Sequence, residues 1–328
     1  MREVTFAEAT LEAMREEMAR DSRVFIMGED IASQGGIFGQ FKGLADQFGL
    51  ERVRDTPISE TAIVGAGIGA ALGGLIPVID MHFADFLGVA MDEVLNQMSK
   101  IRYMFGGQAN LPLVLRAPDG VTRSGAAQHS QSLEAIFMHI PGTKIVAPSN
   151  AEDAKGLLKA AIRDPNPVIY FEHKDLFRRK GQVPDGEHIT PIGKARVTRE
   201  GDSLTVVSYS RMFTEVEAAC QQLGDEVEGK VELIDLRTIV PMDVETILAS
   251  VRKTHRLLIV HEAVKRGGVG AEISAVVAEK AVEYLDAPIV RIGAKPYPIP
   301  FSPPLEREIV PQVDEIISAI RGLLNARI

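Results

Sequence analysis

The stretch Asp55-Thr-Pro-Ile-Ser-Glu60 is followed by nineteen residues without a charge, and this pattern decides how the chain is interpreted. Five glycines lie within the uncharged residues 61–79, whose last part is Leu75-Ile-Pro-Val-Ile. We expect a polar turn, then a buried helix of small residues, then a buried strand. A membrane span is a poorer interpretation, because the glycines make the run only weakly hydrophobic and Pro77 interrupts it.

Glu60 stands where the polar turn meets the uncharged segment. A carboxylate in that place is poorly hydrated, which favours proton exchange with a ring nitrogen near neutral pH. The simpler alternative is a first-turn glutamate that favours the helix dipole, with Ser59 as the N-cap. The residues of this stretch alone leave both interpretations open.

The composition sets the class of protein. A chain of 328 residues with 45% hydrophobic and 25% charged residues is typical of a globular protein with two domains of ordinary size. The formal net charge of −9 argues against nucleic acid or an anionic membrane as the main partner. Cys220, the only cysteine, excludes an internal disulfide framework and a multi-cysteine metal site. The charged start of the sequence lacks the apolar core of a secretory signal, so we expect a cytoplasmic protein.

Runs rich in β-branched residues alternate with helical patterns along the whole chain. The expected strands are 24–27, 75–80, 111–116, 144–147, 168–172, 204–209, 231–235, 257–261 and 289–292. The expected helices include 6–20, capped by Thr5, and 87–105. This alternation predicts an α/β fold with mostly parallel sheets flanked by helices. A polar stretch containing Gly181, Pro184 and Gly186 separates an expected domain 1–185 from a second domain 192–328.

Two histidines are candidates for chemistry. His129 follows a glycine-bearing loop and precedes a helical pattern, and a helix N-terminus keeps a histidine neutral and usable as an acid or base. The alternative is a loop histidine hydrogen-bonded to the backbone. His82 and Phe86 follow the strand 75–80, and strand ends are a typical ligand edge in parallel sheets. The alternative for Phe86 is core packing.

A third candidate site lies at the end of the helical pattern after Asn150. Pro165 and Pro167 stop that helix and leave its last carbonyls without helical partners. With Asp164 and Asn166 beside them, these oxygens suit a hard cation. The alternative is a simple helix end with water on the carbonyls.

Other chemistry receives little support. Gly65-Ala-Gly-Ile-Gly69 matches a dinucleotide fingerprint only in part, because a polar turn rather than a strand precedes it. The sequence also contains no phosphate-binding P-loop, Gly-x-Ser-x-Gly elbow or zinc-ligand spacing.

A series of short motifs in order along the chain resembles the β subunit of thiamin-diphosphate-dependent 2-oxo acid dehydrogenases, the decarboxylating first component. The matching words are Asp55-Thr-Pro-Ile-Ser-Glu60, Asp92-Glu-Val-Leu-Asn-Gln97, Arg102-Tyr-Met-Phe-Gly-Gly107, Ala127-Gln-His-Ser-Gln-Ser132, Ala161-Ile-Arg-Asp-Pro-Asn-Pro167, Pro191-Ile-Gly-Lys194, Asp235-Leu-Arg-Thr238 and Gly268-Val-Gly-Ala-Glu272. The resemblance covers nearly the whole chain. It implies a pyrimidine-binding thiamin diphosphate domain followed by a transketolase C-terminal-like domain.

The resemblance also implies roles for the candidates. Glu60 would hydrogen-bond N1′ of the cofactor's aminopyrimidine ring and exchange a proton there, with Phe86 stacked on the ring and His82 near the exocyclic amine. His129 would orient the substrate or lipoyl group and serve as acid/base in acyl transfer. A structural potassium ion would bind the carbonyls of Leu113, Ala161 and Ile162 and the side chains of Asp164 and Asn166.

The partners follow from the same resemblance. No Gly-Asp-Gly occurs in the sequence, and in this family a separate α subunit binds the diphosphate and its Mg²⁺. The chain would work in an α₂β₂ tetramer and pass an acyl group to the lipoyl acyltransferase second component. Several words are similar to acetoin dehydrogenase β subunits, whereas Ala117-Pro-Asp-Gly120 is similar to pyruvate dehydrogenase, so the 2-oxo acid or acetoin stays open. A transketolase-like or deoxyxylulose-phosphate-synthase-like fragment and a non-catalytic assembly subunit are the alternatives.

Overall fold

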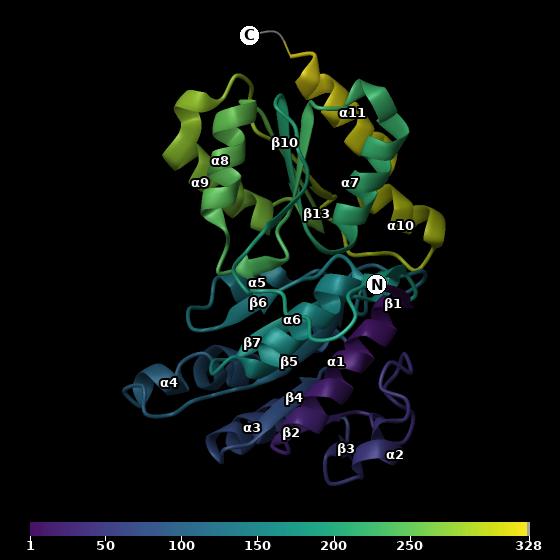
Figure 1. Ribbon diagram of the computed structural model, residues 1–328, viewed down its shortest axis with the longest axis vertical. Coiled ribbons are helices and arrows are strands. Elements are labelled where there is room, and N and C mark those ends of the chain that lie inside the picture. The colour runs from purple at the N-terminus through teal and green to yellow at the C-terminus, as the bar shows by residue number, and fades with distance from the viewer. Residues whose placement is uncertain (327–328) are drawn as a thin grey trace. The chain divides into compact units, whose positions relative to one another are not determined.

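The computed structural model describes residues 1–326 and divides into two compact units (Figure 1). Unit 1 comprises Met1–Asp119 and Ile136–Ile192, and unit 2 comprises Gly120–Ala135 and Gly193–Ile328. The division by sequence into 1–185 and 192–328 stays a prediction. In the structure the segment 120–135, which contains His129, groups with the C-terminal residues.

Unit 1 is built on a sheet whose strands follow the order β6-β7-β5-β4-β2-β3, and all neighbouring strands in this order are parallel. From β1 to β8, the strands are β1 (Arg2–Thr5), β2 (Val24–Gly28), β3 (Val53–Asp55), β4 (Ile76–Asp80), β5 (Val114–Asp119), β6 (Lys144–Val146), β7 (Val168–His173) and β8 (Lys180–Val183). The helices between them are α1 (Phe6–Arg20), α2 (Leu44–Phe48), α3 (Glu60–Leu72), α4 (Ile101–Met104), α5 (Glu134–Met138) and α6 (Ala151–Arg163). The 3-10 helices η1 (Ala84–Gly88) and η3 (Lys174–Leu176) and the π-helical segment η2 (Glu93–Met98) complete the set.

Helix α1 shows how local sequence fixes an element. Thr5 and Glu8 form a capping box, in which each side chain accepts a hydrogen bond from the other residue's backbone N–H. The helix then packs against α6. Its buried Glu17 pairs with Arg163, the last residue of α6, at 2.6 Å. The expected helix and its Thr5 cap are confirmed.

The expected helix 87–105 is wrong as a single element. The chain forms η1, a π-helical segment η2 and the short α4 instead. The N–H of Ser99 donates to the carbonyl of Val94, five residues earlier, at 3.2 Å, and this π-type bonding interrupts the regular α-helical pattern. Three apolar residues of this stretch, Val94, Met98 and Ile101, are buried as one face of a helix there would be.

Unit 2 has a second sheet with order β14-β13-β10-β11-β9, parallel except for β9. Its strands are β9 (Arg196–Arg199), β10 (Leu204–Ser208), β11 (Val231–Asp235), β13 (Leu257–Val264) and β14 (Val290–Ala294), and β12 (Thr238–Val240) is a further strand. The helices are α7 (Ser210–Leu223), α8 (Val244–Thr254), α9 (Val269–Ala281), α10 (Pro303–Ile309) and α11 (Val313–Leu324), with short turns η4 (Gly224–Glu226) and η5 (Val282–Tyr284). Figure 1 shows α8 and α9 on one face of this sheet and α7 and α11 on the other.

Both units therefore have the predicted class, mostly parallel sheets covered by helices. Each sheet has its own buried apolar core, which includes Ile26 and Val78 in unit 1 and Val206 and Leu258 in unit 2. Among the described residues 1–326, no helix combines the length and apolarity needed to cross a membrane.

Candidate active site

Three neighbouring strands of unit 1 end at one edge of its sheet. Gly28, the last residue of β2, lies opposite the last residues of β3 and β4. The chain continues from β2 into Glu29, from β4 through Met81 into His82, and from β3 through a turn into Glu60. Because the strands are parallel, their carboxyl ends meet, and this edge is where α/β sheets bind ligands.

Glu60 is the first residue of α3 and is partly exposed. Ser59 occupies the N-cap position, but its hydroxyl makes no cap hydrogen bond within the described chain. The helix-cap alternative therefore lacks its expected hydrogen bond. The Glu60 carboxylate instead acts electrostatically on another acidic group, Glu29.

Glu29 links the predicted residues of this edge. Its Oε2 lies 3.6 Å from Nδ1 of His82, and each side chain is 13% exposed. Burial raises the pKa of the Glu29 carboxyl; the nearby His82 opposes that shift, and the charge of Glu60 adds to it. The structure thus brings Glu60 and His82 to the same acidic residue.

Phe86 belongs to an aromatic group beside His82. It lies on η1, and its ring stands edge-on to Phe83 at 6.2 Å between centroids. The Phe83 ring also contacts His82 at 5.5 Å and Phe38 at 5.8 Å. Phe86 is only partly buried, so part of its ring can still stack on a ligand.

A buried charge cluster lies on the strands of the same sheet. Arg116 on β5 is fully buried and pairs with Asp80 on β4 and Glu172 on β7. Its guanidinium also stands over the Phe41 ring at 4.7 Å. Burial, opposed by Arg116, raises the pKa of Glu172 to about 7. Two carboxylates share one guanidinium. The cluster thus ties β5 to β7 and to the end of β4, two residues before His82.

His129 lies in unit 2, in the segment 120–135. We expected it at a helix N-terminus, but α5 begins only at Glu134. His129 lies in a turn, where its backbone N–H donates to the carbonyl of Ala126 at 3.4 Å. Ser124 and Ala126 both have positive φ angles, 61° and 57°, which are strained for residues with a Cβ. Strain of this kind persists only where surrounding contacts hold the backbone.

Two buried carboxylates hold this loop. Glu262 accepts hydrogen bonds from the N–H of Val121 at 2.7 Å and from the Ser132 hydroxyl at 3.2 Å. Glu306 accepts one from the N–H of Ser124 at 2.8 Å. Burial, with the charge of Glu262, raises the pKa of Glu134 at the end of the loop to about 7. The backbone around His129 is therefore anchored to its own unit.

The predicted cation donors after α6 already have partners. Asp164 pairs with the Lys144 ammonium and accepts from the Asn166 backbone and side-chain N–H groups at 2.9 Å. Oδ1 of Asn166 accepts from Arg102 at 2.6 Å, and the carbonyl of Ala161 accepts from Asp164 at 3.2 Å. The remaining predicted donors, the carbonyls of Leu113 and Ile162, belong to the same unit. A potassium ion here would share Asp164 with Lys144.

Comparison with known proteins gives full-length matches. Residues 2–180 match the transketolase pyrimidine binding domain, and residues 193–316 match the transketolase C-terminal domain. The chain is 45% identical to 2-oxoisovalerate dehydrogenase subunit beta of Bacillus subtilis, over 98% of each chain. It is 43% identical to pyruvate dehydrogenase E1 component subunit beta of Rickettsia felis, over 97% of this chain and 98% of that protein. This chain belongs to the family of 2-oxo acid dehydrogenase E1 β subunits.

Other relatives of this E1 β subunit differ in their named substrates. It is 43% identical to acetoin:2,6-dichlorophenolindophenol oxidoreductase subunit beta of Bacillus subtilis, over 99% of this chain and 98% of that protein. The three identities are too close to favour one substrate. The motifs similar to acetoin dehydrogenase β subunits therefore do not decide the substrate of this chain. A split gene transketolase, described as an inactive beta4 tetramer, has the same fold, with a TM-score of 0.80, 20% identity and 98% of both chains covered.

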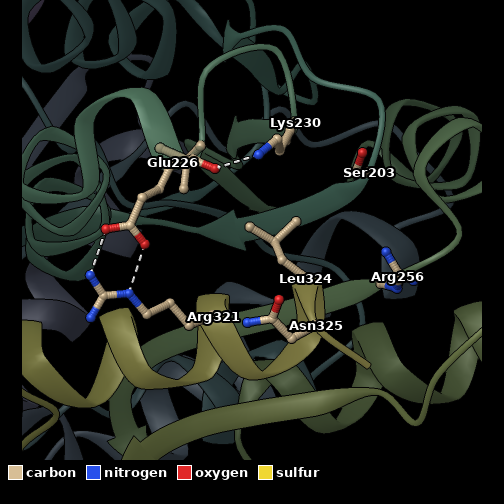
Figure 2. Close-up of a pocket in the computed structure, with 8 residues that line it drawn as sticks. Ser203, Glu226, Lys230, Arg256, Arg321, Leu324 and Asn325 are labelled. Atoms are coloured by element: carbon tan, nitrogen blue, oxygen red, sulfur yellow. Dashed lines mark hydrogen bonds and ion pairs between the residues drawn. The ribbon is translucent and has the colours of Figure 1, made fainter. Parts of the chain in front are cut away.

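A cavity of ≈ 330 Å³ in unit 2 of this E1 β subunit lies apart from the predicted residues (Figure 2). Arg321 from α11 donates to both carboxylate oxygens of Glu226, at 2.6 and 2.8 Å, and Lys230 donates to the Glu226 carbonyl at 3.0 Å. These cationic groups thus have protein acceptors. None of the residues predicted from sequence lines this cavity.

Sequence reasoning missed Glu29, Arg116 and Glu262. For Glu29 a signal existed, because it comes one residue after β2, and the strand-end argument that selected His82 applies equally to it. For Arg116 and Glu262 no local pattern marks a buried charge. Their importance follows only from which strands pair.

Proposed function

We propose that this E1 β subunit supplies the pyrimidine side of a thiamin diphosphate site. Together with an α subunit, in an α₂β₂ tetramer of the cytoplasm, it would cleave the carbon–carbon bond next to the carbonyl of a 2-oxo acid or acetoin. The acyl group would pass to lipoamide on an acyltransferase, the second component. The observation that carries this proposal is Glu60 at the start of α3, beside Glu29 and His82 at one sheet edge.

The residues of this edge fit an aminopyrimidine ring. Glu60 offers a carboxylate that can hold or release a proton at a ring nitrogen. Phe86 offers a partly exposed aromatic face. Nδ1 of His82 is buried and has no hydrogen-bond partner among residues 1–326, and Oε2 of Glu29 lies 3.6 Å from it, so this edge holds an imidazole beside a carboxylate. When bound, thiamin diphosphate supplies a nucleophilic carbon and an electron sink, and the protein supplies position and proton handling.

The α subunit would complete the site. We assign the diphosphate and its Mg²⁺ to that partner, because this sequence contains no Gly-Asp-Gly. His129 would act on the substrate or lipoyl group, and its anchored loop supports that assignment. A positioned acid/base needs a backbone that stays in place, since a small misplacement is costly in rate.

We also propose potassium at the end of α6. Leu113, Ala161 and Ile162 would contribute carbonyl oxygens, and Asp164 and Asn166 would contribute side chains. The ion would stabilise the connection between α6 and β7, where Pro165 and Pro167 prevent further helix.

Co-expression with a candidate α subunit tests the proposed function. The purified complex is assayed with thiamin diphosphate and Mg²⁺ for decarboxylation of pyruvate and branched-chain 2-oxo acids, for cleavage of acetoin, and for acyl transfer to lipoamide. Activity with one of these substrates that depends on thiamin diphosphate and reaches lipoamide is the expected result. Ketol transfer between sugar phosphates without lipoamide would favour the transketolase-like alternative, and a stable complex with neither activity would favour an assembly role.

A further inference from the structure

The contact between Glu29 and His82 carries an inference beyond the residues assigned so far. Oε2 of Glu29 lies 3.6 Å from Nδ1 of His82, which is ion-pair range and about 0.6 Å longer than a hydrogen bond. Nδ1 is buried without a hydrogen-bond partner in the described part of the chain, 1–326. A small torsional change of either side chain would make Glu29 the acceptor for a proton on Nδ1.

The backbone holds both residues in this arrangement. Strands β2 and β4 approach so closely that a Cβ on Gly28 would lie 2.7 Å from the carbonyl oxygen of Asp80. Only glycine fits there, and it sets the spacing between the two strand ends. His82 itself has a φ of 58°, a left-handed conformation that is strained for a residue with a Cβ. Strain at a ligand edge is typical of a residue held for a function.

The charges around the pair identify which group is the base. Glu60, Asp30 and Asp80 act on Glu29 as like charges, whereas His82 favours its ionised form. A carboxylate beside Nδ1 favours the tautomer in which Nδ1 carries the proton. Nε2 is then a bare acceptor.

We infer that Glu29 is a positioning residue of the pyrimidine site, which holds His82 in the Nδ1–H tautomer so that Nε2 accepts from the exocyclic amine. This inference rests on the proposed function. An exocyclic amine is an N–H donor, and the opposite tautomer would set an N–H against it. Glu29 thus selects the state of His82 that can bind the amine.

The experiment uses the assembled complex with the α subunit and ring-¹⁵N histidine labelling. In the cofactor-free complex, His82 should show a protonated Nδ1 and an unprotonated Nε2, and Glu29→Gln should shift it toward the Nε2–H tautomer. Asp30→Asn is the matched control, because it removes a neighbouring like charge without touching His82, and it should leave the tautomer unchanged. An unchanged His82 spectrum in Glu29→Gln would overturn the inference.

Cofactor affinity gives the second readout. Calorimetry should show Glu29→Gln binding thiamin diphosphate about tenfold more weakly, the effect of one lost hydrogen bond. In a His82→Gln background the same change should cost nothing further, because a glutamine amide offers an acceptor without a tautomer. An equal loss in both backgrounds would refute the positioning role. If the wild-type complex binds no thiamin diphosphate, the proposed function fails, while the labelling experiment still decides the Glu29–His82 pairing.

Discussion

The sheet edge of unit 1 and the His129 loop of unit 2 are built in opposite ways. At the edge, His82 has a buried nitrogen without a partner among residues 1–326, and Glu29 lies just beyond hydrogen-bond distance from it. In the loop, buried Glu262 and Glu306 accept backbone N–H groups and hold the chain on both sides of a strained turn. At the edge, two polar side chains face each other without a closed hydrogen bond, whereas the loop uses its polar groups to fix its own shape.

This difference follows from the elements involved. Strand register already fixes the positions of Glu29 and His82, so their side chains need few further contacts. The segment 120–133 has no regular backbone hydrogen bonding of its own, and side chains must replace it. The two regions should therefore respond differently to mutation.

The largest effect is expected beneath the edge. Arg116→Met leaves Asp80 and Glu172 buried without a counter-charge, which should lower the free energy of unfolding by about 3–5 kcal/mol. Denaturant unfolding measures the change. Combining Arg116→Met with Asp80→Asn and Glu172→Gln should recover part of the loss; an unaltered single variant would show that the cluster does not hold the edge.

Glu60→Gln separates the two regions by function. The complex should still bind the cofactor, but exchange of the thiazolium C2 proton should fall by at least about 10²-fold, because the amide cannot exchange the proton. Proton NMR in deuterated buffer follows this exchange. His129→Ala should leave it nearly intact and impair acyl transfer to lipoamide. Ser59→Ala serves as the control. If Glu60→Gln retains the wild-type rate of C2 exchange, Glu60 is only a first-turn residue of α3 and not the acid/base.

Glu262→Ala tests the anchoring of the loop. It removes the acceptor for Val121 and Ser132, so acyl transfer should slow by about tenfold while C2 exchange stays unchanged. Glu262 also pairs with Arg211 at 3.3 Å, and Glu215 pairs with the same arginine at 3.4 Å without contacting the loop, so Glu215→Ala is the matched control. Equal losses in both assays would mean that Glu262 acts on the whole fold rather than on the His129 loop.

The pH dependence of stability probes Glu134 in the same loop. Burial raises the pKa of the Glu134 carboxyl from its ordinary value of 4.5 to about 7 in the folded protein. Between these values the folded state binds more protons, so stability falls as pH rises through the window. Glu134→Gln should flatten that decline, measured as Tm from pH 5 to pH 8. Parallel curves for the variant and wild type would argue against a buried, protonated Glu134.

The smallest effect concerns the proposed cation. Potassium should raise the Tm of the complex by a few degrees relative to sodium, and Asp164→Ala should abolish this difference. Lys144→Met is the companion variant: it frees Asp164 from its ammonium partner and should enlarge the response to potassium. If wild type and Asp164→Ala respond identically to the two salts, the end of α6 is an ordinary helix end and not a potassium site.

Element types and the class of fold could be predicted from the sequence because they depend on local patterns. The predicted strand 231–235 has the same bounds as β11, and helix 6–20 has its predicted cap. The expected helix 87–105 failed as a single element, because the N–H of Ser99 donates to the carbonyl of Val94, five residues earlier, and this bonding makes a π-helical segment. Short motifs also identified the family, because each motif is a run of neighbouring residues that can be read directly from the sequence.

The sequence by itself therefore determined the alternation of strands and helices, the family and the presence of Glu60, His82 and His129. Only the tertiary structure decided that Glu29 faces His82, that Arg116 bridges two carboxylates and that Glu262 holds the His129 loop. The physical reason is that a propensity acts between near neighbours along the chain. Partners such as Glu262 and Val121 meet only after parallel strands have paired and buried their charges.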